Sequence, residues 1–498
     1  MAINTKTYTD NKLLYQDDFR HSAITLYNYK GDPIDITDNV ISIDVFESIK
    51  NHTLTGTITF GDVNSVVERL PIIGKEFVEF KLRTPVQYNG QYGGEINAVK
   101  HKFFVYKISI LEQTTPRNQL VQLSFASVEM LRNSRIRVSE AFSGSYEDAV
   151  QKIFKSKKLL NSNKALFLER TRLSQKVVVP NLRPFDTIDM FANRSVSSMS
   201  NSASFHFYET TQGFHFRSFD SMFRNLKTGF GPVSPTFNYM LETSGTPNPH
   251  NNNAAFLDLQ RVYSHTFENK QDTIRESRTG MMSSKLITYN AYDKTFTTKE
   301  FNYAKDYHTL PHLEVDLGGE FPAVYSIIPE TPADFTEQNT NKEGRNNIYS
   351  DYTDGKTMLA SNTSFIHNTN SESGYHAENT LQSRKHALEI LEKIKLSMTV
   401  PGNTHINAGQ VVHVTVPSYA LEVYEKGDMK QYNRFLTGRY LITDLRHNID
   451  FTTQKHRTYL TLSKETYGTP LINSLSKVPL DNEDELVIVD IGASKEYA

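Results

Sequence analysis

The stretch Leu381–Gly402 reads LQSRKHALEILEKIKLSMTVPG, and its hydrophobic period changes part-way along. In its first half, apolar residues recur every three to four positions, which predicts a helix with one buried face. The residues of that face are Ala387, Leu388, Leu391 and Ile394. From Ile394 onward apolar and polar residues alternate, which predicts a half-buried strand that ends at Pro401-Gly402.

More strands follow this helix and strand. Val412, Val414 and Val416 alternate with polar residues, and the segments 445–451 and 459–462 can pair across a turn at 452–455. A helix laid on a small antiparallel barrel buries all of these apolar faces with few elements. We therefore predict a barrel-like domain over residues 379–467, and we find no active-site motif within it.

Residues 1–130 show a second set of strands with the same alternation. Ile41–Val45 and Leu54–Phe60 predict a hairpin with its apolar faces in register, and further strands are expected around 78–82, 104–110 and 121–125. Short strands separated by turn residues indicate a small barrel or sandwich. The predicted fold class is mainly β with α+β insertions, in which two small antiparallel barrel-like domains are joined by an α+β middle region.

The middle and the end of the chain differ in composition from these two domains. We predict an α+β domain over 131–240, with helices at 146–154 and 185–194 and a hairpin formed by 203–209 and 213–219. A β-rich segment is expected over 241–310, a polar arm or insertion over 311–378, and a tail over 468–498. Within that tail, Leu486–Ile491 is an apolar, β-prone segment that could pair as an edge strand.

Composition excludes several classes of function. At 498 residues the chain is long enough for roughly three or four domains. Its 54 Lys and Arg nearly balance its 56 Asp and Glu, so we predict no nucleic-acid binding specificity. The absence of cysteine excludes disulfides and thiolate metal sites. No apolar run is long enough to cross a bilayer, so we predict no membrane insertion.

Two local patterns resemble known sites but lack essential parts. His308 and His312 are four residues apart, as in a zinc-binding helix, but Pro311 lies between them and the general-base glutamate is missing. Gly355-Lys356-Thr357 resembles the end of a phosphate-binding loop, but the first glycine of that loop is Ser350 here. We predict an ordinary loop in both places.

The predicted hairpin at 203–219 carries the remaining candidates. Glu209 and Asp220 could be paired as glycosidase carboxylates, but two acids on a hairpin are more often solvated strand ends. His206 and His215 could face each other across the hairpin, more often as a packing pair than as a metal site. We therefore predict that the chain is not an enzyme, with no catalytic residue, no cofactor and no metal.

Several stretches together resemble the central baseplate hub proteins of contractile-tailed, T-even-like phages. These hubs are related in architecture to the N-terminal part of type VI secretion spike proteins. The resembling stretches keep the family's order along the chain and consist of strand and turn patterns. They are Thr55–Leu82, Pro184–Val196 with Ser204–Met222, Gly280–Tyr303 and Gly438–Glu465.

The resemblance implies an architectural role in the virion's tail baseplate, assembled in the host cytoplasm. Hubs of this family form homotrimers whose two barrel-like domains per subunit make a pseudo-sixfold ring between a threefold central spike and a sixfold tail tube. The implied partners are the spike protein, the tube protein and adjoining baseplate proteins. We expect Lys395, Thr415 and Arg446 to contribute to such contacts. The alternatives are a tail-tip enzyme that degrades the cell wall and a type VI spike component.

Overall fold

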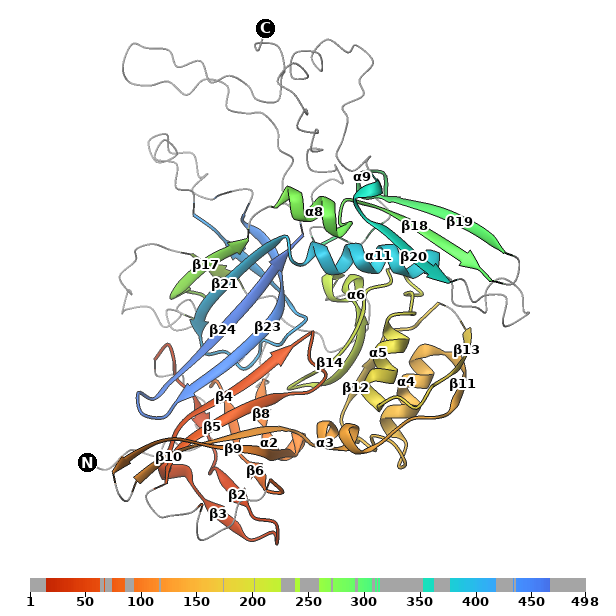
Figure 1. The fold of residues 1–498 in the computed structure, drawn as a ribbon. Helices are drawn as coiled ribbons and strands as arrows, with labels where there is room; N and C mark the ends of the chain where they lie inside the picture. Colours follow the sequence, from red (N-terminus) through yellow and green to blue (C-terminus); the bar gives the residue numbers. More distant parts are fainter. Residues whose placement is uncertain are drawn as a thin grey trace, which may run out of the picture.

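The computed structural model describes residues 15–465 apart from a set of gaps. The gaps are 63–66, 68–73, 86–93, 116–117, 173, 201, 225–237, 242–258, 270–271, 292–293, 307–309, 311, 314–352, 362–376, 418–432 and 434–435. Strands dominate the described residues, so the predicted mainly β fold class is confirmed (Figure 1). None of the described helices is both long and apolar enough to cross a membrane. His308 and Leu486–Ile491 lie outside the described residues.

A first β module, which we define by its strands, occupies the N-terminal part of the chain. Its strands pair in the order β4-β5-β10-β9-β6-β2-β3. They are β2 (Thr25–Tyr27), β3 (Pro33–Asp35), β4 (Val40–Ser48), β5 (Thr55–Asp62), β6 (Phe77–Glu79), β9 (Phe103–Thr115) and β10 (Asn118–Ser127). A small sheet of β1 (Arg20–His21), β7 (Lys81–Arg83) and β8 (Glu95–Asn97) accompanies them.

The predicted hairpin at the start of this module is present. Ile43 lies opposite Ile58, and Val45 lies opposite Gly56. Their inward faces join Phe60, Leu123 and Phe125 in one buried cluster, as the alternating pattern requires. The segment 78–82 differs from the prediction, because it divides between β6 and β7, which belong to different sheets.

A second β module lies towards the C-terminal end and has its own buried cluster. Its strands pair in the order β17-β21-β24-β23-β22-β16. They are β16 (Asn238–Met240), β17 (Ser264–Asn269), β21 (Ile394–Pro401), β22 (Val411–Thr415), β23 (Gly438–Asp450) and β24 (Lys455–Lys464). Leu396, Met398 and Val400 face this cluster together with Leu460 and Leu462.

The two modules share one strand topology. The path β4-β5-β10-β9-β6-β2 in the first corresponds, strand by strand, to β17-β21-β24-β23-β22-β16 in the second. Corresponding strands also occur in the same order along the chain. The connections between strands therefore match as well as the pairings. One pairing differs in direction: β2 and β6 are antiparallel, whereas β16 and β22 are parallel. The chain therefore contains two copies of one β topology.

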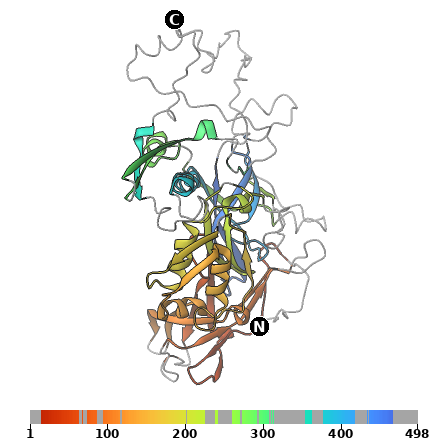
Figure 2. The ribbon, with the colours of Figure 1, turned by 90° about the vertical axis from the view of Figure 1, so that its right-hand side faces the viewer.

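An α+β unit follows the first module and lies beside it in the side view of Figure 2. It contains α3 (Val128–Arg135), β11 (Ala141–Ser145), α4 (Tyr146–Lys155), β12 (Leu166–Leu168), β13 (Ser174–Val178), α5 (Pro184–Ala192), β14 (Phe205–Thr210), β15 (Gly213–Ser218) and α6 (Phe219–Arg224). Ser145 caps α4 by accepting from the Asp148 backbone N–H, and α5 begins at Pro184. The two predicted helices are confirmed.

The hairpin β14–β15 is also present, but its two histidines do not face each other. His206 lies opposite Arg217, and His215 lies opposite Tyr208. The predicted His206–His215 pair is therefore wrong, because the turn sets a register in which these residues are two positions out of line. The ring of His206 stacks on Phe219 instead, and that of His215 stacks on Tyr208.

A three-stranded outer sheet and a long helix complete the described chain. The sheet has the order β19-β18-β20 and contains β18 (Ser283–Asn290), β19 (Thr295–Asn302) and β20 (Thr357–Ser361). The nearby helices are α8 (Thr273–Thr279), α9 (Tyr303–Asp306) and α11 (Ala377–Ile390). Gly355 ends a short 3-10 turn before β20, which is not the strand-to-helix setting of a phosphate-binding loop.

Helix α11 confirms the helix predicted ahead of β21, with two corrections to its buried face. The helix ends at Ile390, so Leu391 lies just after it and Ile394 already belongs to β21. Leu391 and the ring of His386 are buried, and the side-chain amide of Gln382 donates to the Ser284 carbonyl at 3.0 Å. Leu388, predicted to face inward, is 36% exposed. The helix packs on one side against the outer sheet and on the other against the α6 region, which leaves Leu388 at its rim (Figure 1).

Candidate functional site

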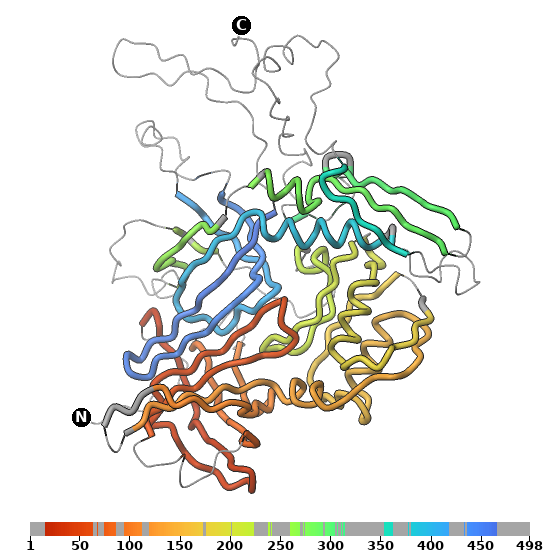
Figure 3. Tube along the Cα trace, viewed as in Figure 1, coloured from red at the N-terminus to blue at the C-terminus, as the bar shows by residue number. Residues whose placement is uncertain are grey.

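Among the described strands, β4 and β23 form the ladder that joins the two β modules. These strands are antiparallel, with pairs running from Asp444 opposite Ser48 to Asp450 opposite Ser42. In Figure 3 the red β4 and the blue β23 lie side by side, although they are about 400 residues apart in the chain. The ladder fuses the modules into one continuous sheet, which fixes their relative orientation more firmly than side-chain contacts alone.

Arg446 fastens this junction on the exposed face of the sheet. Its Nε donates to Asp44 Oδ1 on β4 at 2.9 Å. The guanidinium lies 5.7 Å from the ring centroid of Phe46 on β4 and 5.2 Å from that of Tyr459 on β24. Arg446 therefore contacts both modules through charge and through its flat face. Its side chain remains 44% exposed, so it is also accessible to another molecule.

A groove of about 520 Å³ runs across the same face of the sheet. It is lined mostly by hydroxyl, amide and charged side chains, with few apolar ones. Strands β17, β21, β24, β23 and β4 contribute lining residues such as Thr266, Ser397, Thr461, Asp444 and Ser48. An open groove with mainly polar lining residues fits a macromolecular contact better than a small apolar ligand.

The three residues predicted to make contacts occupy different places. Arg446 lines the groove. Lys395 lies on β21, two residues before the groove residue Ser397, and forms an ion pair with Glu392. Thr415 lies on β22 opposite Met240 of β16, outside the groove lining. The structure therefore brings only Arg446, with Lys395 at the edge, to one surface.

Beneath the junction, Glu47 connects three parts of the chain. It lies on β4 and accepts hydrogen bonds of 3.0 Å from the backbone N–H of Thr211 in the α+β unit and of Ala408 in the second module. The Asn407 side chain donates to it at 3.3 Å. Burial raises the pKa of Glu47 to about 7, although these hydrogen bonds oppose the shift.

The raised pKa of Glu47 predicts a pH-dependent stability. A carboxyl whose pKa rises from 4.5 to about 7 on folding contributes fully below pH 4.5, and this contribution is lost as pH rises through 7. The loss amounts to roughly 3 kcal/mol by pH 8. We expect the difference in unfolding free energy between the wild type and Glu47→Gln to shrink over this range in urea titrations. Glu140→Gln, at an exposed site, is the control, and parallel curves for wild type and Glu47→Gln would contradict the assignment.

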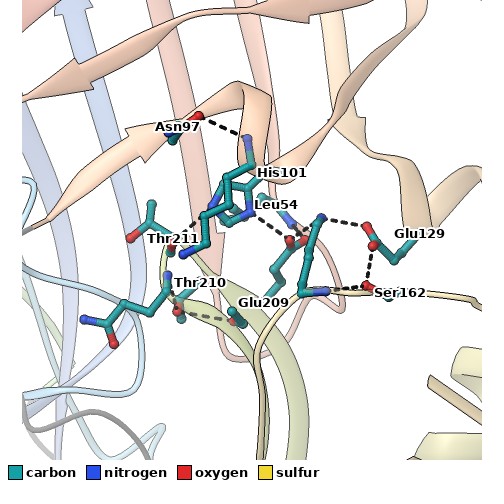
Figure 4. A network of polar contacts seen from close by, with 12 residues as sticks. Leu54, Asn97, His101, Glu129, Ser162, Glu209, Thr210 and Thr211 are labelled. Carbon is teal, nitrogen blue, oxygen red and sulfur yellow. Dashed lines mark hydrogen bonds and ion pairs between the residues drawn. The ribbon is translucent and has the colours of Figure 1, made fainter. Parts of the chain in front are cut away.

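A second buried network joins the first module to the α+β unit (Figure 4). Lys164 Nζ lies 2.6 Å from Glu129 Oε2 and 2.7 Å from Glu209 Oε1, and all three side chains are at most 5% exposed. On the other side, His101 at the end of α2 (Ala98–His101) contacts Glu209 at 3.1 Å. The Leu54 backbone N–H donates to the second Glu209 oxygen at 3.0 Å. Both carboxylate oxygens of Glu209 thus have a partner from another segment of the chain.

This network overturns the prediction that Glu209 and Asp220 are solvated strand ends. Both are buried, because β14–β15 inserts between the two modules and its turn contacts both Glu47 and His101. Burial raises the pKa of Glu209, but Lys164 and His101 outweigh it and hold that pKa well below the usual range. A catalytic acid of a glycosidase needs the opposite shift, so the geometry gives Glu209 a structural role.

Metal ligation finds no support in the part of the chain that the structure describes. No group of three or more His, Asp or Glu side chains there is placed to hold an ion. His312, one of the two histidines of the HTLPHLE pattern, lies 3.3 Å from Glu465. The buried histidines His447 and His456 contact each other at 3.1 Å, and burial lowers the pKa of both rings.

The sequence is similar to that of a known phage protein. No family model matches the sequence. Over 426 residues, it is 20% identical to a probable baseplate hub protein, gp334, of Vibrio phage KVP40, covering 83% of this chain and 88% of the relative. The resemblance to phage baseplate hub proteins is confirmed. This relative also confirms the predicted location, which is the tail baseplate of a virion.

Comparison with solved structures finds distant similarity to two tail proteins and to a type VI secretion component. A tail protein from Neisseria meningitidis MC58 covers 91% of this chain and 98% of its own, at 10% identity and a TM-score of 0.46. The 43 kDa tail protein of prophage MuSo2 from Shewanella oneidensis covers 89% and 98%, at 9% identity and a TM-score of 0.44. An Escherichia coli type VI secretion component covers 87% and 75%, at 8% identity and a TM-score of 0.36.

The sequence did not reveal the residues that hold the two β modules together. Glu47 and Lys164 gave no signal, because a charged residue within a strand or loop usually marks a solvated position. The apolar neighbours of Glu47, Val45 and Ile49, were a usable hint, since they place it near a buried strand end. The β4–β23 ladder joins segments separated by most of the chain, and its partners could not be read from local periodicity.

Proposed function

We propose that this chain is a structural hub of a contractile-tail baseplate, with no catalytic role. The observation that carries the proposal is the pair of β modules of one topology, fused head to tail by the β4–β23 ladder. Repeated surfaces in fixed orientation are what a ring-forming scaffold requires. The confirmed resemblance to a baseplate hub protein supports the same role.

In this proposal three copies form a ring of six modules. Each chain contributes its first module, within residues 1–130, and its second module, within 379–467 together with β16 and β17. Such a ring has exact threefold and approximate sixfold symmetry, so one side can bind a threefold central spike and the other a sixfold tail tube. The α+β unit, from α3 to α6, and the outer sheet project from the ring. Neither nucleic acid nor membrane is a partner.

The proposal is tested by the mass of the purified protein, alone and mixed with candidate spike and tube proteins. We expect a trimer, or a monomer that becomes a trimer when the spike protein is added. Light scattering and native mass spectrometry measure this directly. A protein that stays monomeric with each partner across the micromolar range contradicts the hub role. A dimer or tetramer contradicts the six-module ring.

A further inference from the structure

The strands that correspond to β4 and β23 in the topological repeat do not form a ladder with each other among the described residues. In the ladder within the chain, β4 uses the edge opposite to the one that pairs with β5. Strand β23 uses its second half, residues 444–450, because its first residues pair with β22. In the topological repeat, β17 corresponds to β4 and β9 corresponds to β23. Among the described strands, β17 pairs only with β21, and β9 contacts β6 only through Phe103 and Phe104.

The correspondence holds residue by residue across each sheet. In the first module one row of paired residues is Val45, Gly56, Phe125 and Val105. The equivalent row in the second is Phe267, Leu396, Leu462 and Ile442. A neighbouring row, Ile43, Ile58, Leu123 and Ile108, matches His265, Met398, Leu460 and Leu445. An irregularity follows Val105 in β9 just as one follows Ile442 in β23.

These matched rows determine which residues would lie opposite each other if the same ladder formed between two copies of the chain. In the ladder within the chain, His447 lies opposite Val45. Ile110 is the equivalent of His447, since each lies two residues after the matched pair Ile108 and Leu445. Phe267 is the equivalent of Val45. The repeated ladder would therefore place Ile110 of one copy opposite Phe267 of the next.

We propose that β17 of one copy pairs antiparallel with the second half of β9 in a neighbouring copy, with Phe267 opposite Ile110. The pairing repeats between copies the ladder that joins the modules within each copy. It is head to tail, because the two edges differ, and head-to-tail contacts close into rings when the rotation allows. This inference rests on the proposed ring and identifies the strands that join its subunits.

Exposure of apolar side chains on β9 supports the same arrangement. His447 is 0% exposed, with Val45 of β4 opposite it and His456 of β24 in contact with its ring, whereas its equivalent Ile110 is 60% exposed. Leu111 and Tyr106 on the same strand are also exposed. A long strand edge with large apolar side chains is an aggregation hazard unless another strand covers it. A second copy offers a strand of matching length and register.

Engineered cysteines test the pairing, because the natural chain has none. Residues directly opposite in a ladder have Cβ atoms roughly 4.5–5.5 Å apart, close enough for a disulfide after a small adjustment. We expect Ile110→Cys with Phe267→Cys to give covalent trimers on oxidation, seen on a non-reducing gel. Each single variant should stay uncrosslinked. The matched control pair is Ile274→Cys with Phe267→Cys, since Ile274 is similarly exposed but lies on α8.

A charge substitution gives a second readout that needs no disulfide. Ile110→Arg would bury an unpaired charge against Phe267, and we expect it to raise the concentration at which the trimer half-dissociates by about tenfold or more. Ile274→Arg should leave that concentration unchanged. A wild-type trimer that neither crosslinks through Ile110 and Phe267 nor responds to Ile110→Arg overturns the strand pairing but leaves the hub role standing. A wild-type protein that never forms a trimer overturns the hub role itself.

Discussion

Replacement of Lys164 by methionine is expected to lower the unfolding free energy by about 3–5 kcal/mol. Lys164 is the shared cation of Glu129 and Glu209, at 2.6 and 2.7 Å, in a site that water hardly reaches. Methionine keeps most of the stem but leaves two buried carboxylates facing each other without a counter-charge. The cost comes mainly from those uncompensated charges, and urea unfolding at pH 7 measures it.

The control for this substitution is Lys152→Met. Lys152 pairs with Glu140 at 3.4 Å, but both side chains are about half exposed, so a change below about 1 kcal/mol is expected. Equal effects of the two substitutions would contradict the structural role of the buried network. A triple variant, Lys164→Met with Glu129→Gln and Glu209→Gln, should recover part of the loss because it removes the buried negative charges.

The same network predicts how the protein responds to acid. The pKa of Glu209 is lowered on folding, so its contribution is complete above its unfolded value of 4.5 and is lost as pH falls towards about 2. Lys164→Met removes the main cause of that shift. We therefore expect the stability gap between wild type and Lys164→Met to narrow between pH 4.5 and 2.

Replacement of Gly56 by alanine is expected to destabilise the protein by about 3 kcal/mol. Gly56 lies in β5 opposite Phe125, and an added Cβ would lie 2.3 Å from Phe125 Cζ and 2.4 Å from the Asp44 carbonyl oxygen. The Phe125 ring cannot move away freely, because it packs against Phe103 at a centroid distance of 4.8 Å and against Phe80 at 5.8 Å. Thermal and urea unfolding measure the loss.

The effect of Gly56→Ala should also reach the junction between the modules. Asp44 belongs to β4, accepts from Arg446 and lies opposite Asn448 in the ladder. Thr57→Ala, on the opposite face of β5, is the control and should cost less than about 1 kcal/mol. If Gly56→Ala is as stable as that control, β4 can shift without strain and the junction is less rigid than its contacts indicate.

Local elements followed from the sequence because their causes are local. The alternation at Ile43 and Val45 predicted β4, and the change of period at Ile394 predicted the start of β21, although α11 already ends at Ile390. The cap residue Ser145 predicted the start of α4, and Pro184 predicted the start of α5. The turn of β14–β15 was located too, but its register was not, because the pairing depends on the cores on either side.

The sequence by itself therefore determined the mainly β class, most strands of the two β modules and the lack of a recognisable catalytic motif. It did not assign β16 and β17 to the second module, which was predicted over residues 379–467 alone. Only the tertiary structure decided that the modules share one topology, that β4 and β23 fuse them, and that Glu47, Glu209 and Lys164 are buried at their contacts. The physical reason is range. Periodicity and capping act over a few residues, whereas strand pairing and charge burial depend on segments that only the folded chain brings together.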